Sequence, residues 1–171
     1  ALPNSSINGG TFQDVTFNGN IFSVYGMSIN GRATFINGIV KSDSYWNQTA
    51  PIHFRKGATW SGASNISYID GLVSKEGDEP FTFPIGENGI YAPLTISAPV
   101  GATEIFAAKY KRQSGSDLGG ISDPGLFNVS QCEYWDLTPT NGNYVKSYPL
   151  DITVGWNSFS NCGTSPYITN V

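Results

Sequence analysis

Charged side chains are scarce in this chain. Asp, Glu, Lys and Arg make up 13% of its 171 residues, against about a quarter in an ordinary globular protein. The nine Lys and Arg residues are scattered, and the formal net charge is −4. A nucleic-acid partner requires clustered cations that displace counterions from phosphates, so this composition argues against one.

Helical and membrane-spanning patterns are also missing. No window of about eleven residues shows the 3.6-residue periodicity of a helix. No apolar run approaches the roughly 20 residues that span a bilayer. Instead, 20 Gly and 10 Pro residues separate short runs of Val, Ile, Thr and aromatic residues. This mix predicts an all-β protein with many turns and almost no helix.

Residues for catalysis are few. The single histidine, His53, lies in an alternating run where an outward or hydrogen-bonded histidine is the expected role. A Ser or Cys nucleophile requires a base, and zinc requires four ligands. We therefore predict no catalytic residues, no enzyme activity and no cofactor.

The chain has two cysteines, Cys132 and Cys162. An even count in a Gly-rich, Lys-poor chain fits an exported protein in an oxidising compartment, so we expect a disulfide. Two buried free thiols are the alternative. The chain starts with Ala1, and we expect it to be a processed or excised piece.

Residues 1–72 consist of short apolar runs separated by Asn-Gly. INGIVKS at 36–42 is echoed by IDGLVSK at 69–75. A stack of short strands with turns at fixed corners, a β-solenoid, fits this pattern, because Asn and Gly tolerate left-handed backbone. A meander of antiparallel hairpins fits it as well, since Asn-Gly is also the strongest hairpin signal. The pattern alone does not decide between them.

The stretch 69–99 joins two differently textured parts of the chain. We predict that an N-terminal lobe, 1–72, and a C-terminal lobe, 73–171, meet near residues 70–80. Alternation along the two strands of this stretch predicts that five side chains are buried: Phe81, Phe83, Ile85, Leu94 and Ile96. We also expect Trp135 and Trp156 in the C-terminal core.

Three passages resemble a recurrent region of large surface and secreted proteins of Bacteroidota bacteria: ING-IV followed by GATWSGASNISYIDGLVSKEG, then FTFPIGENGIYAPLTISA, then CEYWDL. The resemblance extends from about Thr34 to Trp156, and FTFPIG followed by YAP is its most specific part. Those proteins often leave the cell by the type IX route. The resemblance implies a short β-solenoid-like lobe joined to a β-sandwich, an extracellular or cell-surface location and no catalytic residues.

Two groups of side chains are candidate binding residues. Exposed aromatic rings on a β face can stack on sugars, whereas buried rings would cap the core. The N-terminal half carries four such rings: Tyr45, Trp46, Trp60 and Tyr68. Four carboxylates are candidate ligands for Ca²⁺, although their spacing matches no calcium loop and a solvated turn is the simpler interpretation: Asp70, Glu76, Asp78 and Glu79.

The chain ends on a strand-like run whose Tyr167, Ile168 and Val171 are candidate assembly edges. Open solenoid ends carry unpaired backbone groups that pair with other strands, and head-to-tail contacts can grow into a filament. These edges predict a module that acts with other subunits or neighbouring domains, and the resemblance implies a non-catalytic structural or adhesive module of a bacterial surface or secreted protein. The alternative is a carbohydrate-binding module that holds polysaccharide through the N-terminal aromatics.

Overall fold

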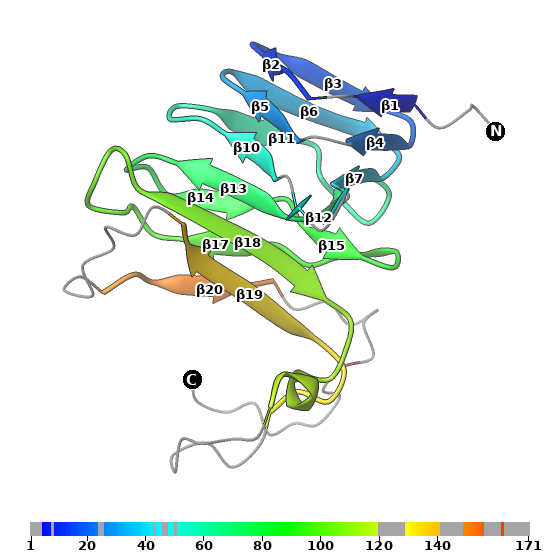
Figure 1. Ribbon diagram of the computed structural model, residues 1–171, viewed down its shortest axis with the longest axis vertical. Helices are drawn as coiled ribbons and strands as arrows, with labels where there is room; N and C mark the ends of the chain where they lie inside the picture. The colour runs from blue at the N-terminus through cyan, green and yellow to red at the C-terminus, as the bar shows by residue number, and fades with distance from the viewer. Residues whose placement is uncertain are drawn as a thin grey trace.

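The computed structural model describes residues 5–7, 9–23, 26–42, 44–45, 48–49, 51–119, 129–140, 149–155 and 162 (Figure 1). The protein is all-β, as the sequence predicts. The described residues form six sheets and one 3₁₀ turn, Gly115–Leu118. Within these ranges, no helix has the length and apolar character to cross a membrane.

The N-terminal strands follow one another in groups of three. The groups are β1 (Ser5–Ile7), β2 (Thr11–Phe12) and β3 (Val15–Asn18); β4 (Ile21–Ser23), β5 (Met27–Ile29) and β6 (Arg32–Asn37); β7 (Val40–Ser42), β10 (Ile52–Phe54) and β11 (Thr59–Ser61). Two strands of the next turn, β12 (Ile69–Gly71) and β13 (Val73–Glu76), follow. Equivalent strands of successive groups lie side by side and parallel, in the orders β1-β4-β7-β12, β2-β5-β10-β13 and β3-β6-β11.

Parallel pairing shows that the hairpin-meander interpretation is wrong for these strands. The described exceptions are the short antiparallel pair β8 (Ser44–Tyr45) and β9 (Gln48–Thr49) and a single antiparallel bridge between Ser64 and Ser67. The reason lies in the Asn-Gly corners, which turn the chain onto the next sheet instead of reversing it. Gly38 has φ +89°, and its N–H donates to the Ile66 carbonyl, 2.9 Å away in the next turn of the chain.

Apolar side chains from successive groups stack in register between the parallel sheets. Ile21 pairs with Val40, which pairs with Ile69, and the last two are completely buried. Phe17 and Phe35 contact each other with ring centroids 5.0 Å apart. Each fully buried side chain of this size contributes about 1.5–3 kcal/mol relative to exposure. Short strands are therefore stabilised by stacking rather than by their own length.

Antiparallel strands cover the far end of this stack. They are β14 (Phe81–Phe83), β17 (Leu94–Ile96) and β20 (Ile152–Val154) in one sheet, β15 (Gly86–Glu87) and β16 (Ile90–Tyr91) in a second, and β18 (Ile105–Lys111) and β19 (Tyr134–Pro139), which extend the β2-β5-β10-β13 sheet. That sheet crosses the expected lobe boundary, because Val73 pairs with both Ile52 and Ala108. The prediction of five buried side chains in the joining stretch is confirmed.

The C-terminal part contains the predicted disulfide. Cys132 and Cys162 are bonded, with Cα atoms 5.9 Å apart, so the free-thiol alternative is wrong. Trp135 packs against the core only partly buried, and its Nε1 donates to the Ala92 carbonyl at 3.0 Å. Trp156 lies outside the described residues.

Candidate functional site

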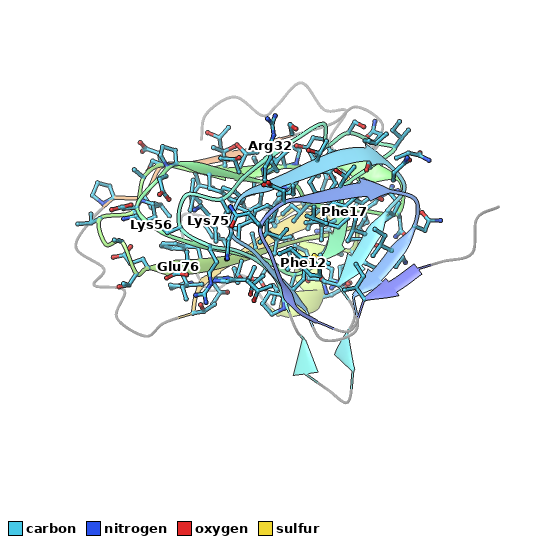
Figure 2. All side chains as sticks on the ribbon, turned by 90° about the horizontal axis from the view of Figure 1, so that it is seen from above. Phe12, Phe17, Arg32, Lys56, Lys75 and Glu76 are labelled. Atoms are coloured by element: carbon cyan, nitrogen blue, oxygen red, sulfur yellow. A yellow bond between two sulfur atoms is a disulfide. The ribbon has the colours of Figure 1, made fainter. Side chains whose placement is uncertain are left out.

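Two consecutive turns of the stack carry charged residues at the same corner. Arg55 and Lys56 follow β10, and Glu76 and Asp78 lie at the end of β13 and just beyond it. Arg55 Nη1 lies 3.0 Å from Glu76 Oε2, and Lys56 Nζ lies 3.0 Å from Asp78 Oδ1. Because β10 and β13 are parallel neighbours, each cation meets a carboxylate of the next turn. Figure 2 shows Lys56, Lys75 and Glu76 together on one side of the molecule.

Lys75 is the buried cation of this corner, with 3% of its surface exposed. Its Nζ donates to the Arg55 carbonyl at 3.0 Å, to the Glu76 carbonyl at 2.8 Å and to Glu79 Oε2 at 3.0 Å. Nζ also lies 5.6 Å from the centroid of the Phe81 ring. An ammonium group has three N–H donors, and here all three are used, which makes its burial tolerable.

A depression of about 290 Å³ lies beside the charged corner, lined by Lys75 and residues 57–60 and 79–82. Trp60 is its partly exposed aromatic member. The indole Nε1 donates to the Thr82 carbonyl, and the ring is 6.2 Å from the Phe35 ring at an interplanar angle of 86°. These two contacts fix the orientation of the indole.

Glu79 is the carboxylate of this depression. Its Oε1 accepts a hydrogen bond from the Gly57 N–H at 3.2 Å, while Oε2 accepts from Lys75. Burial acts to raise the pKa of Glu79, but the hydrogen bond and charge of Lys75 outweigh it and hold the pKa below its ordinary value. Glu79 is therefore ionised at neutral pH.

His53 lies on the neighbouring β10 strand. Its Nδ1 is 2.8 Å from Ser74 Oγ, and its Nε2 is 3.5 Å from Glu76 Oε2. A Ser-His-Glu set of this kind has the outline of an activated nucleophile. However, Ser74 is only 3% exposed, so a substrate carbonyl cannot reach its hydroxyl. The arrangement holds the histidine in the sheet.

His53 should make the fold sensitive to mild acid. Burial lowers its pKa below the ordinary 6.5, with Arg55 and Lys75 acting in the same direction and Glu76 against it. The unfolded state then binds more protons just below pH 6.5, so the free energy of unfolding falls as pH drops through that window. We expect His53→Gln to flatten this fall between about pH 7 and 5, measured by urea unfolding. An unchanged pH profile would contradict the assignment.

The two aromatic candidates whose side chains the structure describes differ in burial. Tyr68 is 1% exposed and its hydroxyl accepts from the Gly89 N–H at 2.8 Å, so its prediction as a sugar-stacking residue is wrong. Its ring fills the core instead. Trp60 lines the depression. Several other candidates lie outside the described residues: the side chain of Tyr45, and Trp46, Tyr167, Ile168 and Val171.

The carboxylate candidates for calcium are dispersed among cations. Asp70 lies 3.4 Å from Lys41 Nζ, and Glu76, Asp78 and Glu79 face the cations of the charged corner. Within the part of the chain that the structure describes, no three His, Cys, Asp or Glu side chains are grouped to hold a metal ion. The calcium hypothesis therefore gains no support from the geometry.

Sequence reasoning missed the cations of this corner. The signal was present as opposite charges spaced 21 and 22 residues apart, Arg55 with Glu76 and Lys56 with Asp78. The same offset of 21 separates Ile52 from its sheet partner Val73.

Comparison of the chain with protein-family models, curated proteins and solved structures finds no match. The function is therefore inferred from geometry.

Proposed function

We propose that this chain is a non-catalytic structural or adhesive β module of an extracellular or cell-surface protein. Residues 1–72 would form a short β-solenoid and residues 73–171 a β-sandwich. Parallel pairing between successive groups of strands supports the first, because solenoids bury their apolar faces by stacking repeats. The antiparallel strands β14, β17 and β20 support the second. The disulfide fits an oxidising compartment.

The edge of the first group carries this proposal. Among the described strands, β1, β2 and β3 each stand at the end of their sheet. The carbonyls of Gly10 and Phe12 accept hydrogen bonds from the N–H of Ser28 in β5 and from the N–H of Asn30, directly after β5. Backbone groups alternate sides along a strand, so those of Thr11 point away from β5.

The two ends of the stack differ. At the far end, the Ile69 N–H donates to the Pro84 carbonyl at 2.8 Å, and β13 pairs with β18. The first group lies opposite, at the top of Figure 1. An edge strand of this kind accepts a strand from a neighbouring subunit or domain, which suits a module that works in an assembly.

A proline at the free edge tests this proposal. We expect the isolated chain to self-associate with rising concentration in sedimentation velocity, because β2 can pair with a second copy. Thr11→Pro removes the outward N–H without removing a bond to β5, so it should yield a folded monomer. Thr11→Val keeps the N–H and should associate like the parent chain. Equal association of the Pro and Val variants, or a parent chain that stays monomeric, would contradict the proposal.

A further inference from the structure

We infer that the depression beside Trp60 binds one pyranose ring of a neutral polysaccharide, with the ring stacked on the indole and one of its hydroxyls donating to Glu79. This inference rests on the adhesive form of the proposed function and names a ligand class for it. Three properties of the site carry the argument: a fixed aromatic platform, a fixed carboxylate with free acceptor capacity, and a balanced local charge.

The aromatic platform is fixed before any ligand arrives. The indole N–H is held by the Thr82 carbonyl, and the ring packs against Phe35. A flexible side chain loses about 0.5–1.5 kcal/mol of rotamer freedom when a ligand immobilises it, and Trp60 avoids most of that loss. The C–H face of a pyranose ring carries partial positive charge, which suits the negative face of an indole.

The carboxylate is equally fixed and retains acceptor capacity. An ionised carboxylate has about four lone-pair positions. In Glu79, Gly57 and Lys75 occupy two of them, one on each oxygen. A hydrogen bond from the Glu79 backbone takes a further position, which leaves about one for a hydroxyl of the sugar. The exposed Thr59 of the same turn adds a hydroxyl to the rim.

Charge and size narrow the ligand class. Arg55, Lys56 and Lys75 each already face a carboxylate. An acidic sugar would therefore meet the Glu79 carboxylate without a cation left to offset the repulsion, which favours a neutral ligand. The volume of about 290 Å³ is at the lower limit of small-molecule sites, which start at about 300 Å³. That volume suits one ring of a longer chain.

An NMR titration of the whole chain tests the inference. The neutral probes are cellohexaose, laminarihexaose and mannohexaose, and trigalacturonate is the acidic comparison, each to about 10 mM to cover millimolar Kd values. We expect at least one neutral probe to shift the indole N–H of Trp60 and the amides of Gly57 and Thr82. The indole N–H signal of Trp135 should not shift with any probe. Trigalacturonate should leave the spectrum of the protein unchanged.

Variants decide whether Trp60 and Glu79 hold the sugar. Trp60→Ala should weaken binding at least about tenfold, and Glu79→Gln about fivefold. Ile36→Ala, at an exposed apolar residue outside the depression, should bind like the parent chain. If Trp60→Ala fails to fold, the Glu79→Gln result decides.

Three results would overturn the inference: no shift with any neutral probe, shifts confined to other residues, or a folded Trp60→Ala or Glu79→Gln chain that binds like the parent. The Thr11→Pro variant separates this test from that of the proposed function. It should lose self-association and keep sugar binding, so failure of one leaves the other measurable.

Discussion

Replacing Lys75 with Ala should lower the free energy of unfolding by about 3–5 kcal/mol, the range for removing one partner of a buried charged pair. The variant removes the Lys75 donor from the Arg55 and Glu76 carbonyls and the cation from the Glu79 carboxylate. The Arg55 carbonyl keeps the hydrogen bond from the Ala58 N–H. It also removes the aliphatic stem that brings Nζ over the Phe81 ring. Urea unfolding followed by circular dichroism measures the change. Because Glu79 is 39% exposed on its side chain, the lower end of the range is expected.

Two companion variants separate charge from packing at this corner. Lys75→Met keeps the aliphatic stem but removes the N–H donors. It should therefore be more stable than Lys75→Ala, yet less stable than the parent chain by about 1–3 kcal/mol. Lys41→Ala removes a lysine whose side chain is 46% exposed and paired with Asp70, and should cost under about 1 kcal/mol. A Lys75→Ala chain as stable as Lys41→Ala would show that the three hydrogen bonds do not tie the corner together.

The sequence predicted the parts of this fold that depend on local pattern. Alternation along FTFPIG was sufficient to identify Phe81, Phe83 and Ile85 as buried, because one face of a strand in a folded domain meets the core. The scarcity of helical periodicity was sufficient for the fold class. The even number of cysteines and the Gly-rich, Lys-poor composition were sufficient to predict the bond between Cys132 and Cys162.

Pairing direction required information that a short pattern does not carry. Asn-Gly supports both a hairpin and a corner, since both need positive φ. The stack is also irregular in length: Ile21 pairs with Val40, 19 residues on, while Val40 pairs with Ile69, 29 residues on. An uneven period hides the register from sequence inspection.

The sequence identified Trp60 as an aromatic candidate of this site, and it identified Glu79 only as a calcium candidate. Trp60 and Tyr68 each follow a hydroxyl residue in a short apolar run, but the Tyr68 ring is buried and the Trp60 ring lines a depression. That difference depends on which turn packs against which sheet. Lys75 was missed because a lysine in an alternating strand is normally expected at the surface. Its burial follows from acceptors contributed by two turns of the chain.

A single methyl group added at Gly38 should have a large effect on stability. The residue has φ +89°, and a Cβ there would lie 2.2 Å from the Gly19 carbonyl carbon and 2.4 Å from the Gly19 oxygen. These are backbone atoms of the preceding turn, so a rotamer change cannot relieve the contact. The two corners would have to separate, which disturbs the hydrogen bond from the Gly38 N–H to the Ile66 carbonyl.

We therefore expect Gly38→Ala to lower the free energy of unfolding by about 3–5 kcal/mol, from strain at positive φ together with overpacking. Gly89→Ala is the matched control, because Gly89 has φ +82° and a Cβ added there would meet no atom within 4 Å. Gly89→Ala introduces backbone strain without overpacking, so it should lower the free energy of unfolding by only about 1–2 kcal/mol. The difference between the two variants in urea unfolding measures how closely the corners of successive turns are stacked. Equal losses at Gly38 and Gly89 would mean that the corners separate freely, and that stacking of the short strands does not depend on the glycine contact.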